Sequence, residues 1–153
     1  QMLASLKALI PGANHWQTLE RNLSEQFEAR FSLVEILATP SIFLENMAGW
    51  RLPVAVAHGE GRMQVAENGS HLTAMRFVDH RGLPTENYPD NPNGSTGGVT
   101  CTTSEDGRAT ILMPHPERVI RNVTWSVRPN VWEDEMSPWF QMFLNAAEWA
   151  RRN

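Results

Sequence analysis

His115 and Glu117 stand two positions apart, and together they offer a base and a carboxylate that could orient it. Pro114 and Pro116 flank the histidine, and a proline biases the residue before it toward extended backbone conformations. Because residues i and i+2 of an extended segment share a face, we expect the two side chains to lie side by side. A carboxylate bound to one ring nitrogen fixes the tautomer and leaves the other nitrogen free to act as a base. The pattern is that of a catalytic triad without its nucleophile.

His58 and Glu60 form a second pair with the same spacing, but glycines rather than prolines surround it. Both pairs follow an apolar stretch of strand length, and α/β proteins bind ligands beyond strand ends. Glycines allow a sharp turn or the close approach of a ligand, whereas prolines favour the first pair as the preorganised one. From the residues alone, each pair could be catalytic, a structural hydrogen bond or a set of metal ligands. All four side chains together would suit a metal hydrolase.

Cys101 is the only cysteine, so it is the only thiol in the chain that could act as a nucleophile. It falls inside a predicted strand over 99–103, whereas reactive cysteines favour helix N-termini or electropositive corners. We therefore expect a buried structural residue. A single cysteine also excludes an internal disulfide and suits a reducing, cytoplasmic compartment. The chain has no CxxC signature for structural zinc.

The composition is that of one globular domain: 153 residues, 41% hydrophobic and 20% charged. The net charge is −4 and there is no long basic run, which argues against binding to nucleic acid. No apolar stretch approaches membrane-spanning length and no signal peptide is visible, so no membrane partner is expected.

Alternating and helical apolar patterns predict an α/β fold. A turn at 104–107 predicts a β-hairpin just before His115, and Ser137-Pro138 provides the N-cap and first residue of a C-terminal helix. The opening helix stops at Pro11-Gly12 and no capping residue precedes it. The predicted strands are 27–37, 53–57, 75–78, 99–103 and 108–113, with 85–88 as a returning partner, and the predicted helices are 2–10 and the segment from 137.

Five segments occur in an order that carries a resemblance to a known family. They are Gln1-Met2-Leu3, Phe27-Glu28-Ala29-Arg30-Phe31-Ser32, His58-Gly59-Glu60-Gly61-Arg62, Tyr88-Pro89-Asp90-Asn91-Pro92-Asn93-Gly94-Ser95 and Met113-Pro114-His115-Pro116-Glu117-Arg118. The chain resembles the C-terminal part of the triad-type (class I) glutamine amidotransferase domain of phosphoribosylformylglycinamidine synthases, in their large single-chain form. The resemblance covers essentially all 153 residues.

This resemblance implies a doubly wound, flavodoxin-like α/β domain of which residues 1–153 form the C-terminal portion. The nucleophilic cysteine would belong to a Gly-x-Cys-x-Gly-x-Gln elbow in which Gln1 is the last residue. It would therefore lie upstream of this chain, together with the preceding strands. The isolated chain is then expected to be inactive.

The resemblance also implies a reaction: a Cys-His-Glu triad releases ammonia from glutamine for an ATP-dependent ligase of purine biosynthesis. His115 and Glu117 match the family's His and Glu, and Gln1 would help to hold glutamine. His58, Glu60, Arg62 and Asn93 would shape the pocket mouth or face the synthetase part. No cofactor is expected in this segment, since ATP and magnesium belong to the parent synthetase. The expected partners are glutamine, the upstream half of the domain and the synthetase domains. The alternative is a non-catalytic structural or regulatory remnant that docks on the synthetase part.

Overall fold

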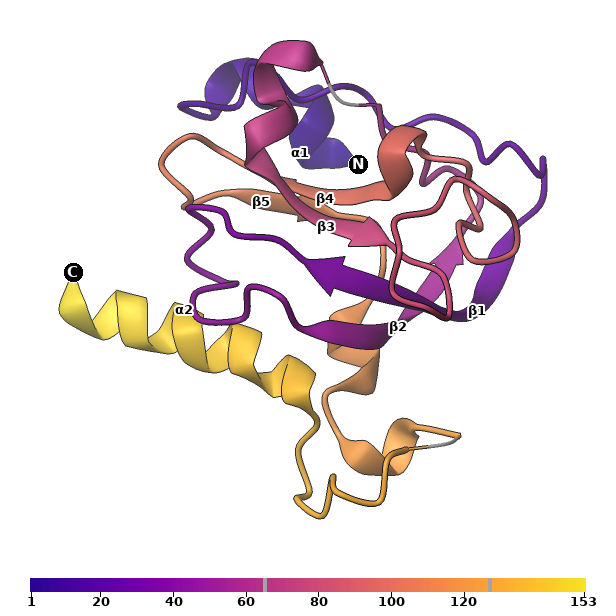
Figure 1. The fold of residues 1–153 in the computed structure, drawn as a ribbon. Coiled ribbons are helices and arrows are strands. Elements are labelled where there is room, and N and C mark those ends of the chain that lie inside the picture. The colour runs from indigo at the N-terminus through magenta and orange to yellow at the C-terminus, as the bar shows by residue number, and fades with distance from the viewer. Residues whose placement is uncertain (65, 127) are drawn as a thin grey trace.

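One five-stranded sheet organises the chain in the computed structural model, which describes residues 1–64, 66–126 and 128–153. The strand order is β2-β1-β3-β4-β5 (Figure 1). The strands are β1 (Glu28–Ile36), β2 (Arg51–His58), β3 (Thr73–Phe77), β4 (Val99–Thr103) and β5 (Thr110–Leu112).

Every strand pairing in this sheet is antiparallel, with Glu28 opposite His58 in β1–β2 and Cys101 opposite Leu112 in β4–β5. The mixed α/β class is therefore confirmed, but the strands described here do not form the parallel sheet of a doubly wound fold. Between β4 and β5 the physical reason is the short connection. Parallel neighbours need a crossover of a dozen or more residues, usually a helix, whereas the β4–β5 turn permits only antiparallel pairing.

All five predicted strands are present, and one further prediction is wrong. Segment 85–88 does not return as a strand beside β3; the chain makes an isolated bridge between Val78 and Pro84, and the Thr85 N–H donates to the Phe77 carbonyl (3.2 Å). Pro84 and Pro89 bracket the segment, and a proline removes a backbone donor from any ladder.

The two α-helices lie at the ends of the chain. The opening helix is shorter than predicted: α1 spans Met2–Ser5 and a 3₁₀ turn follows at Lys7–Leu9. The C-terminal helix starts as predicted, because the Ser137 hydroxyl accepts a hydrogen bond from the Trp139 N–H (3.3 Å). A 3₁₀ turn at Pro138–Phe140 leads into α2 (Gln141–Arg152). Further 3₁₀ turns span Glu67–Leu72, Thr96–Gly98, Pro116–Val119 and Asn122–Thr124.

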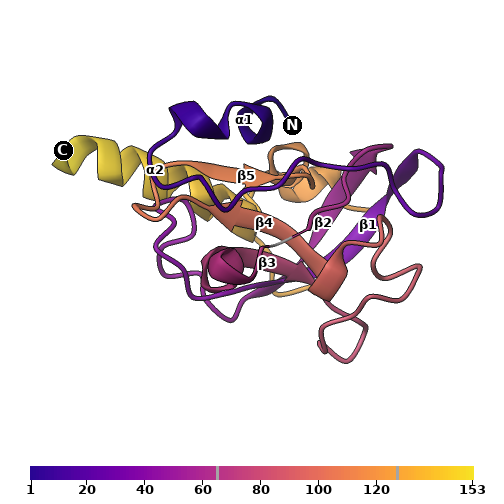
Figure 2. The ribbon, with the colours of Figure 1, turned by 90° about the horizontal axis from the view of Figure 1, so that it is seen from above.

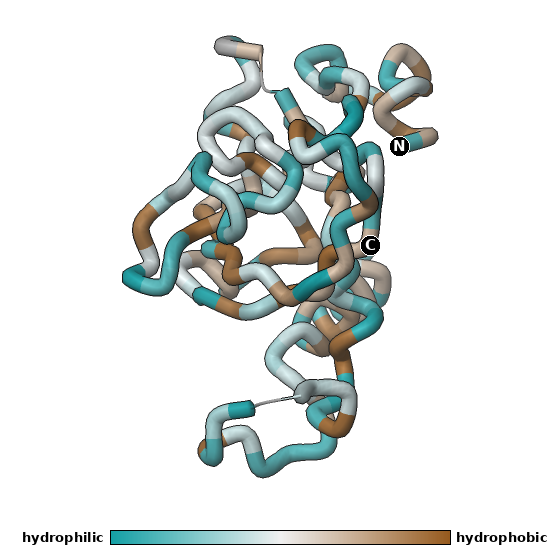
Figure 3. The backbone as a smooth tube through the Cα atoms, turned by 90° about the vertical axis from the view of Figure 1, so that its right-hand side faces the viewer, coloured by the Kyte–Doolittle hydropathy of each residue, from teal (hydrophilic) through white to brown (hydrophobic). Residues whose placement is uncertain are grey.

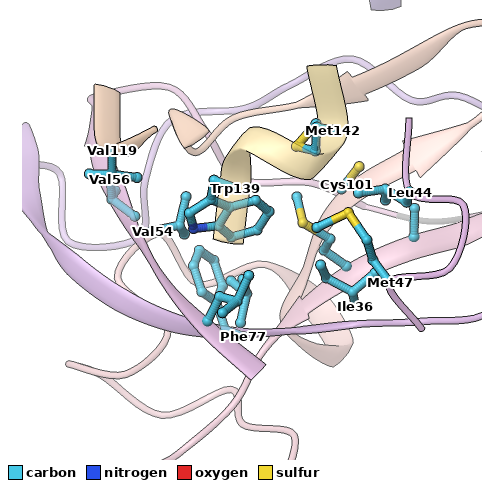
Figure 4. Packing of buried hydrophobic residues seen from close by; sticks show 14 of the residues in the cluster. Ile36, Leu44, Met47, Val54, Val56, Phe77, Cys101, Val119, Trp139 and Met142 are labelled. Carbon is cyan, nitrogen blue, oxygen red and sulfur yellow. The ribbon is translucent and has the colours of Figure 1, made fainter. Parts of the chain in front are cut away.

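Trp139 fixes the C-terminal segment to the sheet. It is fully buried among Val54, Phe77 and Met142 (Figure 4), and its indole N–H donates to the Pro53 carbonyl (2.7 Å). Burying a tryptophan is stabilising, and the hydrogen bond satisfies its one polar group. A second, smaller cluster around Trp16 packs Ala4 against β4 and β5, so the N-terminal segment covers the side of the sheet away from α2 (Figure 1). Figure 2 views the molecule from this N-terminal side.

Apolar residues also remain at the surface of α1 and the turn after it. Met2 is 72% exposed and Leu9 is 77% exposed, and Leu3 and Leu6 are also exposed. In Figure 3, the segment next to the N-terminus shows brown, hydrophobic stretches. In the described part of the chain no helix has the length and apolar character needed to cross a membrane.

Candidate functional site

The His115 corner is held between two strands that are not adjacent in the sheet. The Met113 N–H donates to the Thr100 carbonyl of β4 (3.3 Å), and the His115 N–H donates to the Ala55 carbonyl of β2 (2.7 Å). The loop that follows β5 therefore reaches β2, although β5 and β2 form opposite edges of the sheet. The backbone of the histidine is therefore fixed before its side chain makes any contact.

His115 and Glu117 make the contact that their spacing predicts: Nδ1 of the ring lies 2.7 Å from Oε1 of the carboxylate. The backbone conformation that brings the two side chains together differs from the extended one that we expected. His115 has φ −115° and ψ 78°, but Glu117 lies in the 3₁₀ turn Pro116–Val119 rather than in an extended segment. Pro116 suits the first position of that turn because its fixed φ matches helical geometry and its missing N–H costs no hydrogen bond.

This contact fixes the tautomer of His115. A carboxylate only accepts, so Nδ1 carries the proton and Nε2 of the neutral ring is the free base. Nε2 has no hydrogen-bond partner among the residues that the structure describes. The His115 side chain is 28% exposed and that of Glu117 is 53% exposed, so a reactant has access to the pair.

A pocket of about 330 Å³ adjoins the pair. Its polar lining comes from His115, Glu117 and Thr110, and the rest is apolar. The apolar walls are contributed by Phe43, Leu112, Pro114, Pro116, Met142 and Phe143. The pocket therefore lies between the corner and α2.

His58 and Glu60 do not form a second dyad, because they point to different partners. His58 is buried (5% exposed) at the end of β2, and its Nε2 lies 3.2 Å from Nδ2 of Asn93. Glu60 instead accepts a hydrogen bond from the Gln1 side chain (2.6 Å). The structure thus joins Gln1 with Glu60 and His58 with Asn93. Arg62 lies apart from both, in an ion pair with Glu20.

Two asparagines clamp the glycine-rich turn after His58. Asn22 donates to the His58 carbonyl (2.7 Å) and accepts from the Gly61 N–H (3.1 Å). Asn93 donates to the Gly61 carbonyl (2.8 Å). A Cβ at Gly61 would lie 2.1 Å from the His58 ring, so only glycine fits here. Sequence reasoning missed Asn22, because nothing in its polar surroundings distinguishes it from a surface residue.

The environment of His58 lowers its pKa. Burial is the main cause, and the nearby His115 acts in the same direction, while the Met113 carbonyl and Glu28 raise the pKa by smaller amounts. His58 is therefore neutral near pH 7. Of its two ring nitrogens, Nε2 lies against Asn93, and the buried Nδ1 has no hydrogen-bond partner among the described residues.

Cys101 lies in the interior of β4, 1% exposed, and burial raises the pKa of its thiol. The expected structural role is supported by this position, since the thiolate is the reactive form and burial disfavours it. In the described ranges no three His, Cys, Asp or Glu side chains are grouped as metal ligands, so the metal-hydrolase interpretation of the two pairs has no ligand set there.

Comparison with known proteins agrees with this geometry. The family model of the CobB/CobQ-like glutamine amidotransferase domain matches residues 1–150, and the chain belongs to this family. The resemblance drawn from the motifs is confirmed at this level. Among solved structures, PurLQS from Thermotoga maritima is similar, with a TM-score of 0.64 and 20% identity over 90% of this chain. The match covers 55% of that chain, so this chain spans about half the length of its structural relative.

Proposed function

We propose that this chain supplies the His and Glu of a Cys-His-Glu triad in the glutaminase part of a phosphoribosylformylglycinamidine synthase. The observation that carries the proposal is the 2.7 Å contact between Nδ1 of His115 and Glu117, which leaves Nε2 as a free base at an accessible corner. The family membership supplies the substrate class, glutamine. The specific ligase reaction, which makes formylglycinamidine ribonucleotide from formylglycinamide ribonucleotide, glutamine and ATP, rests on the motif resemblance.

In this mechanism a cysteine thiolate from outside these residues attacks the side-chain amide carbon of glutamine. His115 Nε2, protonated as the thiolate forms, gives its proton to the leaving ammonia. Glu117 holds the ring in the required tautomer and stabilises the imidazolium. Water then attacks the thioester, with His115 as base, and releases glutamate. ATP and magnesium serve the synthetase part and are not needed for these steps.

The rest of the domain belongs to the same proposal: residues 1–153 are the C-terminal part of one glutaminase domain, and its nucleophile and parallel strands lie upstream. Three observations support this. The structural relative is about twice as long as the matched region. Apolar side chains are exposed on α1. The outer edge of β5 has no partner strand in the described sheet. A cytoplasmic setting follows from the biosynthetic reaction and the single cysteine.

The test is His115→Ala in the complete enzyme. Glutamine-dependent activity should fall by about 10²- to 10⁴-fold, because a general acid–base group is lost. Synthesis from added ammonia should be unchanged, since it bypasses the glutaminase. His80→Ala is the control, since His80 is exposed and lies in the turn after β3. If His115→Ala leaves glutamine-dependent activity intact, the chain is a structural or regulatory remnant instead.

A further inference from the structure

Glu60 has no part in the mechanism above, yet its carboxylate holds a residue that lies 59 positions away along the chain. Nε2 of Gln1 donates to Oε2 of Glu60 over 2.6 Å. Because a carboxylate only accepts hydrogen bonds, the amide nitrogen of Gln1 is the atom that faces it. Hydrogen bonds to an ionised group are shorter and stronger than those between neutral groups, so this contact restrains the Gln1 side chain.

The turn that carries Glu60 is itself held on both sides. The two asparagines described above clamp its backbone, and the Asn22 N–H also donates to the Gly59 carbonyl (2.9 Å). Beyond Glu60, Arg62 exchanges two backbone hydrogen bonds with Glu20, of 3.0 Å and 3.1 Å. The carboxylate of Glu60 therefore extends from a fixed backbone.

The strand that leads into this turn also holds the proposed base. The His115 N–H donates to the Ala55 carbonyl of β2 (2.7 Å). Ala55 and Glu60 belong to one continuous segment, which is extended up to His58 and then clamped through the turn. Segment 55–60 thus contacts the backbone of His115 at one end and the side chain of Gln1 at the other.

The contact with Glu60 complements a second attachment of α1. Ala4 of this helix is 1% exposed and packs in the Trp16 cluster on β4 and β5. Met2 and Leu3, which lie between Gln1 and Ala4, are exposed. An element attached at one point can pivot about it, whereas two attachments fix its direction. The hydrogen bond to Glu60 supplies the attachment at Gln1.

We propose that Glu60 is a positioning residue for the triad: by holding Gln1, it sets the nucleophile elbow against the strand to which the His115 backbone is bonded. The inference rests on the proposed glutaminase function, in which Gln1 is the last residue of the Gly-x-Cys-x-Gly-x-Gln elbow. β2 and its turn then determine the distance between the thiol and the imidazole. Glu60 touches no reacting atom and acts on the cysteine only through Gln1.

Two substitutions in the complete enzyme separate the hydrogen bond of Glu60 from its charge. Glu60→Met keeps the length of the side chain but removes the acceptor, and the glutaminase kcat should fall by about 10- to 100-fold, as for a misplaced catalytic group. Glu60→Gln keeps an oxygen that accepts from Gln1, so kcat should stay within about threefold of the wild type. Ammonia-dependent synthesis should be unchanged in both. Glu133→Met is the matched control, because Glu133 is also exposed and its carboxylate has no partner among the described residues.

The reactivity of the elbow cysteine reports its position directly. A nearby imidazolium lowers the pKa of a thiol, and the thiolate is the form that iodoacetamide alkylates. In Glu60→Met the pH midpoint of alkylation should therefore rise toward the ordinary thiol value of about 8.5, as it should in His115→Ala. Glu60→Gln should keep the wild-type midpoint. Glutamine is absent from this measurement, so Gln1→Met should give the same shift even if Gln1 also holds substrate.

A Glu60→Met variant with the wild-type kcat and alkylation midpoint overturns the proposal. A Glu60→Gln variant as impaired as Glu60→Met also overturns it, because the charge and not the hydrogen bond would then matter. The double variant of Gln1→Met and Glu60→Met should be no worse than either single change, and additive losses contradict a shared bond. His115→Ala is run alongside: if it leaves glutamine-dependent activity intact, the proposed function itself has failed.

Discussion

At the scale of single residues, the proposed chemistry depends on which nitrogen of His115 carries the proton. Glu117 places it on Nδ1. This contact follows from a two-residue spacing, so it was predictable from the sequence. The contact between His58 and Asn93 was not, because the two residues are far apart along the chain and meet only through the fold.

Cys101→Ala tests which thiol performs the chemistry. In the complete enzyme this change should leave glutamine-dependent activity unchanged, since the thiol is buried in β4 and its pKa is raised. It should cost about 1 kcal/mol of unfolding free energy, as for the loss of one small buried group. Urea unfolding and a glutaminase assay measure the two effects.

The isolated chain provides the complementary measurement. Without a nucleophile from upstream it should hydrolyse no glutamine. Hydrolysis by the purified 153-residue chain that disappears in Cys101→Ala would show that Cys101 is the nucleophile after all.

At the scale of elements, local sequence predicted the strands well and their arrangement poorly. The alternation over 27–37 and the turn at 104–107 correspond to β1 and to the β4–β5 hairpin. Apart from the short β4–β5 turn, the order β2-β1-β3-β4-β5 is set by contacts between residues far apart along the chain, and by packing against α2. Neither is encoded within a single element. The opening helix was predicted too long, because its apolar spacing continues through a 3₁₀ turn.

Gly107→Ala tests the turn that joins β4 to β5. Gly107 has φ +72°, and a Cβ there would lie 1.8 Å from the Pro40 carbonyl oxygen. We expect the unfolding free energy to fall by several kcal/mol. Alanine would be strained in the left-handed conformation of residue 107, and the backbone at Pro40 would have to move to make room for its Cβ. The matched control is Gly49→Ala, where φ is +83° but nothing lies within 4 Å. It should cost only about 1 kcal/mol. Equal losses at the two positions would show that the contact with Pro40 is unimportant.

At the scale of the whole molecule, one carboxylate forms ion pairs that link three neighbouring strands of the sheet, β2, β1 and β3. Glu35 of β1 contacts Arg76 of β3 (2.8 Å) and Arg51 of β2 (3.2 Å), and its side chain is only 13% exposed. The hydrogen bond from Arg76 is the largest cause of a lowered pKa at Glu35, and Arg51 adds to it. Such a group stabilises the folded state above its unfolded pKa.

The stability conferred by Glu35 should therefore decline with acidity. The ordinary pKa is 4.5 and the folded value is lower, so the contribution is complete well above pH 4.5 and is lost as the pH falls through the folded pKa. Urea unfolding of the wild type and of Glu35→Gln should differ most near pH 7 and converge at low pH. A difference that stays constant down to the acid limit would mean that the charge of Glu35 does not stabilise the fold.

The hydrogen bond from the His115 N–H to the Ala55 carbonyl has a consequence for how the protein acquires activity. It joins residues that are far apart along the chain, and contacts of that kind close large loops and form slowly. The proposed base therefore reaches its working position only after β2 and the β4–β5 hairpin have come together. During refolding of the complete enzyme, recovery of glutaminase turnover should lag behind recovery of secondary structure, so turnover reports the completion of folding rather than its onset.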